Sequence, residues 1–311
     1  MYINHLADYM AGDLSWMEER YSHLKQQSLL WQPPTLESAN TPRCTMDGKP
    51  TIMLSANNYL NLTTHPKVVE ASIAATRKYG AGSGSVRAIA GTMDIHLEAE
   101  RKVAEFKGVE SALIYSAGYT VNVGLIPSLV QGKQDIIISD ELNHGSIIDG
   151  VRLTKAKRAV FPHNDMGALE QVLKENDDSD RKLIIVDGVF SMDGQIAKLD
   201  EIVFLAEKYD AMVMVDDSHA TGFVGAKGRG SADHFGVMNK IDIFTSTLGK
   251  AIGGASGGFT TGKKEIIDLL RQKSRPYLFS NSIAPSVASA AIEAFKIIEK
   301  NNKLKNSLEK N

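Results

Sequence analysis

A single lysine, Lys250, stands in a glycine-dense segment between two short apolar runs, residues 241–244 and 259–261. Glycines remove side-chain bulk and let the backbone approach whatever the lysine touches. A partly desolvated lysine loses its proton more easily, and the neutral amine can attack a carbonyl carbon to form a Schiff base. The alternative is a surface lysine in an ordinary glycine-rich loop, and the rest of the chain must distinguish the two.

An acidic residue, Asp216, follows the apolar run 213–215, and His219 comes three residues later. A carboxylate at the end of a buried strand can hold a proton on a heteroaromatic nitrogen and so keep that ring cationic. The imidazole can donate to an oxygen on the same ring. The alternative is a helix N-cap, in which Asp217 or Ser218 caps the next turn.

Three further polar segments follow apolar runs, and each can bind one part of such a ring compound. The backbone N–H groups of Gly118 and Tyr119, at a strand-to-helix turn, can bind a phosphate. His144 can stack flat on the ring, and Ser191 can share a hydrogen bond with the ring oxygen. The alternatives are a tight turn, a helix-start hydrogen bond and a simple turn serine. Taken together, the groups describe a site for pyridoxal 5′-phosphate, which binds as a lysine imine and accepts carbanion electrons.

These residues need a scaffold that brings strand ends together, and the chain predicts one from residue 111 onwards. Near-continuous apolar strands alternate with amphipathic helices, which is typical of a parallel sheet covered on both faces. Ligands collect at the carboxyl ends of such strands. The predicted strands are residues 112–115, 136–139, 159–161, 183–186, 212–215 and 241–244, and the predicted helices between them are 121–130, 146–154, 166–175 and 199–209.

The segments outside this core are predicted from the same patterns of spacing, proline and glycine. We expect a helix within residues 1–30, an arm at 31–50 with a short hairpin around Asp47 and Gly48, and a strand at 51–55. The other predictions are helices at 66–79, 92–106 and 285–300, a strand-like piece at 259–261 and a polar tail at 301–311.

Composition narrows the classes of function. The chain has 311 residues with 35 Lys and Arg against 37 Asp and Glu, so its charge gives no reason to propose nucleic acid or an anionic membrane as partner. One cysteine, Cys44, fits a reducing cytoplasm. We expect neither a signal peptide in residues 1–10 nor a membrane span. The absence of a G-x-G-x-x-G motif argues against a nicotinamide dinucleotide enzyme.

Four motifs carry a resemblance to a known family. They are Thr247-x-x-Lys250-Ala251-x-Gly253-Gly254, the segment 215–222 around Asp216, the segment 143–150 around His144, and the segment 187–194 around Ser191. On these motifs the chain resembles the α-oxoamine synthases, pyridoxal-phosphate enzymes of aminotransferase fold type I. The resemblance covers residues 50–300 and implies a mostly parallel, seven-stranded α/β sheet covered by helices.

The resemblance also implies roles for individual residues. Lys250 resembles the imine lysine and proton shuttle, Asp216 the partner of the pyridine nitrogen, and His144 the stacking residue. His219 and Ser191 would address the ring oxygen. The phosphate would be bound by Gly118, Tyr119, Thr247 and, from the neighbouring subunit of a homodimer with shared active sites, Ser280 and Asn281. Asn57 resembles an asparagine near the substrate.

Residues 225–230, 248–258 and 274–282 most resemble family members that condense glycine with acetyl-CoA. Members that make 8-amino-7-oxononanoate or use a palmitoyl donor are the alternatives. The family implies an N-terminal helix and arm at 1–50, a large cofactor domain at 51–284, and a helix at 285–311 leading to a small C-terminal domain. That domain, with its substrate-binding arginine, is absent here, so a cofactor-binding fragment without full activity is the non-enzyme alternative.

Overall fold

The computed structural model describes residues 13–311, and the chain divides into two compact units. The smaller unit comprises residues up to 38 together with 43–52. It contains helix α1 (Ser15–Gln26). The helix predicted over residues 1–30 is therefore confirmed at 15–26 and wrong at 13–14 and 27–30, and its part at 1–12 lies outside the described residues.

The smaller unit also contains the hairpin predicted around Asp47 and Gly48. Strands β1 (Arg43–Met46) and β2 (Lys49–Ile52) pair antiparallel, and both turn residues have positive φ, as two-residue hairpin turns require. The strand predicted at 51–55 is wrong beyond Ile52. Ile52 pairs with Arg43, and Met53 N–H still donates to the Pro42 carbonyl at 3.0 Å. Pro42 has no N–H with which to continue the ladder.

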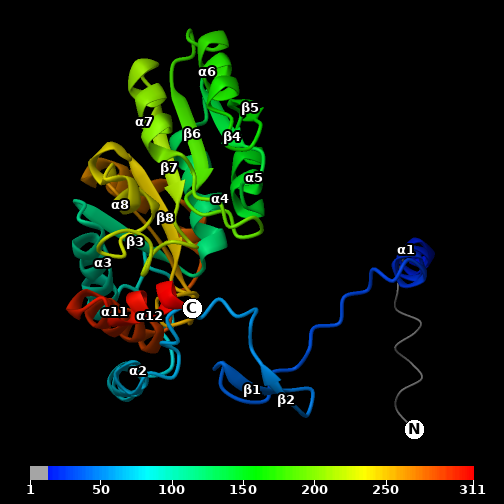
Figure 1. Cartoon of the computed structure of the whole chain (residues 1–311), viewed down its shortest axis with the longest axis vertical. Helices are drawn as coiled ribbons and strands as arrows, with labels where there is room; N and C mark the ends of the chain where they lie inside the picture. Colours follow the sequence, from blue (N-terminus) through cyan, green and yellow to red (C-terminus); the bar gives the residue numbers. More distant parts are fainter. Residues whose placement is uncertain (1–12) are drawn as a thin grey trace. The chain divides into compact units, whose positions relative to one another are not determined.

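The larger unit, residues 39–42 and 53–311, is built on the seven-stranded sheet that the resemblance implies (Figure 1). The strands are β3 (Ser111–Tyr115), β4 (Ile136–Asp140), β5 (Lys157–Phe161), β6 (Lys182–Asp187), β7 (Met212–Asp216), β8 (Ile243–Thr247) and β9 (Gly258–Gly262), in the order β3-β9-β8-β7-β6-β4-β5. Within this sheet, β9 runs opposite to the other six strands, and so pairs antiparallel with both β3 and β8. The ten residues 248–257 between β8 and β9 contain no crossover helix, and a parallel return would need one.

Helices cover both faces of this sheet. They are α2 (Pro66–Tyr79), α3 (Asp94–Lys107), α4 (Gly118–Leu129), α5 (Gly145–Arg152), α6 (Met166–Glu175), α7 (Leu199–Lys208), α8 (Ser231–Phe235), α9 (Lys264–Lys273), α10 (Arg275–Phe279), α11 (Pro285–Lys300) and α12 (Lys303–Lys310), with a short 3₁₀ helix at Met238–Lys240. On β6, Leu183 and Ile185 pack with α4, α5 and α9, whereas Ile184 and Val186 pack with α6 and α7. Among residues 13–311, no helix is long and apolar enough to cross a membrane.

Two predicted elements need correction. The polar tail expected at 301–311 contains helix α12, because Leu304 and Leu308, four residues apart, both pack against the core. The strand expected at 241–244 begins two residues later, since the Asp242 carboxylate accepts the N–H of Val213. The other core strands and helices are confirmed, with ends that differ by a few residues.

A fully buried ion pair ties the end of α3 to the loop that follows β7. Lys107 Nζ lies 2.8 Å from Asp217 Oδ2, both side chains are 0% exposed, and the ammonium also donates to the Arg229 carbonyl. The other Asp217 oxygen accepts from the N–H and hydroxyl of Ser231. This network fixes the residue next to Asp216, and therefore fixes the floor of the site described below.

We expect Lys107→Ala to destabilise the protein strongly, because it leaves the Asp217 carboxylate buried without its cation. Removing one partner of a buried pair costs about 3–5 kcal/mol. Urea denaturation measures the loss. The matched control is Lys174→Ala, which breaks the exposed pair with Glu170 and should change the midpoint little. Equal effects of the two substitutions would contradict the anchoring role.

Candidate active site

A cavity of about 120 Å³ opens at the carboxyl ends of the parallel strands. Its walls come from the segments that follow β3, β4, β6, β7 and β8, which places the cavity where α/β sheets bind ligands. The lining residues are Gly118, Tyr119, His144, Ser146, Asp187, Ser191, Asp216, Ser218, His219, Thr247 and Lys250.

The Lys250 amine ends a chain of hydrogen bonds in this cavity. Its Nζ lies 2.8 Å from His219 Nε2, and His219 Nδ1 lies 2.7 Å from the Tyr59 hydroxyl. The Tyr59 hydroxyl in turn donates to Asn57 Oδ1 at 3.2 Å. Since Tyr59 donates to Asn57, its oxygen can accept from His219 Nδ1–H, which leaves Nε2 as the acceptor for the lysine amine.

Burial makes both groups of this pair weaker bases. Burial lowers the pKa of His219 to about 4, and the charge of Lys250 acts in the same direction. Burial also lowers the pKa of Lys250, while the carboxylate of Asp216 acts against it. At neutral pH the imidazole is therefore neutral, and Lys250 holds more free amine than an exposed lysine does.

The Asp216 carboxylate is buried at the end of β7 and is held from two directions. Its Oδ1 accepts from the N–H of Ser218 at 2.9 Å, within its own loop. Its Oδ2 accepts from Asn122 Nδ2 at 2.6 Å, and the same amide reaches Ser146 Oγ at 2.9 Å. Asn122 belongs to α4, so the carboxylate is fixed by the helix as well as by its strand.

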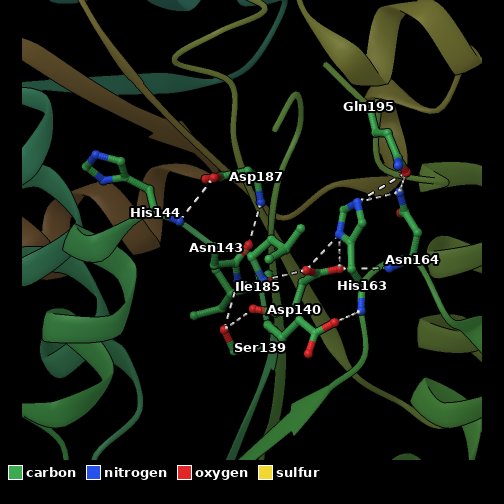
Figure 2. Close-up of polar contacts among 11 residues, drawn as sticks. Ser139, Asp140, Asn143, His144, His163, Asn164, Ile185, Asp187 and Gln195 are labelled. Atoms are coloured by element: carbon green, nitrogen blue, oxygen red, sulfur yellow. Dashed lines mark hydrogen bonds and ion pairs between the residues drawn. The ribbon is translucent and has the colours of Figure 1, made fainter. Parts of the chain in front are cut away.

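A second carboxyl, Asp187, ends the neighbouring strand β6 directly opposite Asp216 in the register. Its Oδ2 accepts the backbone N–H of His144 at 3.1 Å, and its own N–H donates to Asn143 (Figure 2). Burial raises the pKa of the Asp187 carboxyl well above its ordinary value, and the charge of Asp216 raises it further. The Asp187 carboxyl therefore takes up a proton more readily than an exposed aspartate does.

The N-terminus of α4 can bind a phosphate. The first N–H groups of a helix have no partner within the helix, and here they begin at Gly118 and Tyr119. A Cβ on Gly118 would lie 3.0 Å from the Cβ of Thr247, and one on Gly258 would lie 2.6 Å from the Cα of Gly118. The two glycines therefore allow the helix start to approach the end of β8 and the start of β9.

The structure brings most of the predicted site residues together. Those that line the cavity are Gly118, Tyr119, His144, Ser191, Asp216, His219, Thr247 and Lys250. Asn57 reaches the cavity through Tyr59. Ser280 and Asn281 are not among the described residues that line it, and Asn281 forms an isolated β-bridge with Val86. The individual roles of these residues stay predictions.

Sequence reasoning missed several residues that contact the site, namely Tyr59, Asn122, Ser146, Asp187 and Ser218. One of them carried a signal: Asp187 is an acid directly after a predicted strand, like Asp216. Asn122 carried none, because a polar residue within a predicted helix is ordinarily taken as solvent-exposed.

Three comparisons with known proteins agree with this geometry. A family model for aminotransferase class I and II matches residues 49–311. The chain is 50% identical to an 8-amino-7-oxononanoate synthase of Thermoanaerobacter pseudethanolicus, over 95% of this chain and 75% of that protein. It is 53% identical to a 2-amino-3-ketobutyrate coenzyme A ligase of Escherichia coli, over 84% of this chain and 66% of that protein.

A solved structure also superposes closely. It is a serine palmitoyltransferase from S. paucimobilis with a bound PLP–myriocin aldimine, with a TM-score of 0.87 and 33% sequence identity. The match covers 93% of this chain and 76% of that one.

We expect the Lys250 amine to react at lower pH than an exposed lysine, because burial lowers its pKa and enlarges its neutral fraction at each pH. Reductive methylation of the cofactor-free protein, followed residue by residue with mass spectrometry, gives the pH at which each lysine reaches half of its maximal methylation rate. Lys174, which is exposed, is the internal reference. Asp216→Asn should lower the Lys250 midpoint further, since the carboxylate opposes the shift. Coincident midpoints for Lys250 and Lys174 would refute the assignment.

Proposed function

Because the chain belongs to the α-oxoamine synthases, pyridoxal 5′-phosphate enzymes of the aminotransferase class I and II family, we propose that it condenses glycine with acetyl-CoA to give 2-amino-3-oxobutyrate and CoA. The observation that carries the proposal is the meeting of three groups in one cavity. They are the Lys250 amine, the Asp216 carboxylate and the His144 imidazole.

The residues of the cavity fit the cofactor. The start of α4 at Gly118 and Tyr119 would hold its phosphate, and Asp216 would face its ring nitrogen. His144 would lie against the ring, and Lys250 would bind its aldehyde carbon. When bound, pyridoxal phosphate supplies an electron-accepting ring that stabilises negative charge on the α-carbon of an amino acid.

The chain's own residues supply the proton transfers and the orientation. Lys250, with its lowered pKa, has the free amine needed to take a proton from the α-carbon near neutral pH. Asp216, held by Asn122 and Ser218, keeps a fixed negative charge toward the ring nitrogen and so retains the proton there. His219 contacts the Lys250 amine and can exchange hydrogen bonds with the ring oxygen as that amine moves.

The phosphate site draws on a second subunit in this proposal. Ser280 and Asn281 would reach the phosphate of the neighbouring subunit in a homodimer with shared active sites. Two contacts support a fixed loop at this position: the bridge between Asn281 and Val86, and the hydrogen bond from the Ser282 hydroxyl to the Gly91 carbonyl at 2.6 Å.

The second candidate is synthesis of 8-amino-7-oxononanoate from alanine and a pimeloyl thioester. Relatives that carry this name are 48–50% identical and cover 92–95% of the chain, which is more of it than the glycine-using relative covers. A long-chain activity of the serine palmitoyltransferase kind is the third candidate, supported by the structural match.

Acyl-donor kinetics distinguish these candidates. We expect kcat/KM for glycine with acetyl-CoA to exceed that for alanine with a pimeloyl thioester by about ten-fold or more, a difference of roughly 1.4 kcal/mol in transition-state binding. CoA release is the assay. The reverse preference would replace the proposal with the second candidate. CoA release that needs no amino acid, or no release with any donor, would refute an acyltransferase function.

Two substitutions test the residues in the cavity. Lys250→Ala should abolish the pyridoxyl group that borohydride otherwise fixes to the protein, whereas Lys174→Ala should leave it unchanged, as peptide mass spectrometry would show.

Asp216→Ala should retain bound cofactor yet slow α-proton exchange of glycine by about a hundred-fold or more, since the charge facing the ring nitrogen is lost. Exchange at the wild-type rate, measured by NMR in D₂O, would rule out the role of Asp216.

A further inference from the structure

A cluster beside the cavity joins three neighbouring strand ends through one histidine (Figure 2). His163 follows β5, and its Nδ1 lies 3.0 and 3.2 Å from the two carboxylate oxygens of Asp140, at the end of β4. On its other side, Nε2 lies 3.2 Å from Gln195 Oε1. The ring also packs edge-on against Phe190, with centroids 4.3 Å apart.

The carboxylate of Asp140 is the fixed point of this cluster. It is 2% exposed, and it accepts from the N–H of Leu142 at 2.9 Å and from the N–H of Asn164 at 3.0 Å. The first of these bonds shapes the turn that leads to His144. The second holds the loop after β5, so both loops are attached to the same carboxylate.

The segment 188–196, which we call the Ser191 turn, depends on this cluster for its position. Its tip is exposed, with Met192 at 91%, whereas Phe190 is 2% exposed. Within the turn, Phe190 N–H donates to the Gln195 carbonyl, and Gly194 N–H donates to the Phe190 carbonyl. His163 contacts two side chains of this turn, Phe190 and Gln195. Phe190 also packs in the core, and Gln195 Oε1 also accepts from Asn164 Nδ2 at 3.1 Å.

We propose that His163 is a positioning residue for the cofactor cavity. Together with Asp140, it holds the Ser191 turn at a fixed distance from the loop that carries His144, so that the serine hydroxyl faces the ring oxygen while the imidazole lies against the ring. The proposal rests on the cavity being the cofactor site. His163 is not among the residues that line the cavity, so its effect would pass through Phe190 and Gln195.

Hydrogen exchange of the cofactor-free protein tests this without relying on catalysis. His163→Asn keeps an N–H for Asp140 but loses the contacts to Phe190 and Gln195, so the protein should remain folded while the turn loosens. We expect exchange of the Phe190 and Gly194 amides to rise about three- to ten-fold, the range for losing one or two weak contacts. The matched control is His234→Ala, an exposed histidine that packs edge-on against Phe235 in α8.

Cofactor affinity is the second readout. The cofactor-free variants are titrated with pyridoxal phosphate and followed by absorbance. We expect the dissociation constant of His163→Asn to be about three- to ten-fold higher than that of the wild-type protein. Gln195→Ala, which leaves the bond between His163 and Asp140 intact, should have the same effect, and the double variant should add little more.

Several outcomes would overturn the proposal. Unchanged exchange in the Ser191 turn of a folded His163→Asn protein would do so, as would fully additive effects of His163→Asn and Gln195→Ala. Loosened exchange with unchanged affinity would remove the link to the cofactor cavity. Failure of wild-type protein to bind pyridoxal phosphate would instead refute the cofactor site and leave the exchange result standing.

Discussion

The site depends on the placement of one partly buried amine, that of Lys250, in the cavity. Lys250 must be held close enough to other groups to react, yet away from enough water to give up its proton. The neutral His219 imidazole meets the first need, because it accepts from the amine without adding a positive charge beside it. The Asp216 carboxylate opposes the loss of the proton, since its charge favours the protonated amine and raises the pKa of Lys250. The free amine is therefore a balance between burial and one nearby negative charge.

Two carboxyls, Asp187 and Asp216, are register partners at this edge of the sheet, and the charge of Asp216 helps burial to raise the pKa of Asp187. The two carboxyls differ in the hydrogen bonds that they accept. Asp216 accepts two hydrogen bonds, one of them from a side-chain amide, whereas Asp187 accepts only one backbone N–H within the described contacts. The two hydrogen bonds fix the orientation of the Asp216 carboxyl, which we propose faces the ring nitrogen of the cofactor.

The sequence predicts the residues at strand ends well, because a parallel sheet collects the carboxyl ends of its strands at one edge. Asp216 and Lys250 follow apolar runs, and this alone places them together. It does not predict contacts between segments that are far apart in the chain, such as Tyr59 with His219 or Asn122 with Asp216. Tertiary packing determines those contacts, and a lone tyrosine or a polar residue within a helix has no local sequence pattern that predicts them. For the same reason the helix α12 was not predicted, because its sequence is mostly polar and only two leucines pack against the core.

Two buried clusters outside the cavity, an ion pair and a group of hydrogen bonds, hold the segments that form its walls before any ligand binds. On one side Lys107 holds Asp217, the residue after Asp216, and on the other Asp140 holds both His163 and the turn to His144. Neither cluster lines the cavity, so a bound cofactor would not have to displace their contacts. Since ordering loops upon binding would consume part of the binding free energy, loops fixed in advance leave more of it for affinity and for orientation. Lys250 itself lies between these anchored segments on a glycine-rich connection. The geometry thus places Lys250 beside loops that contacts outside the cavity hold in position.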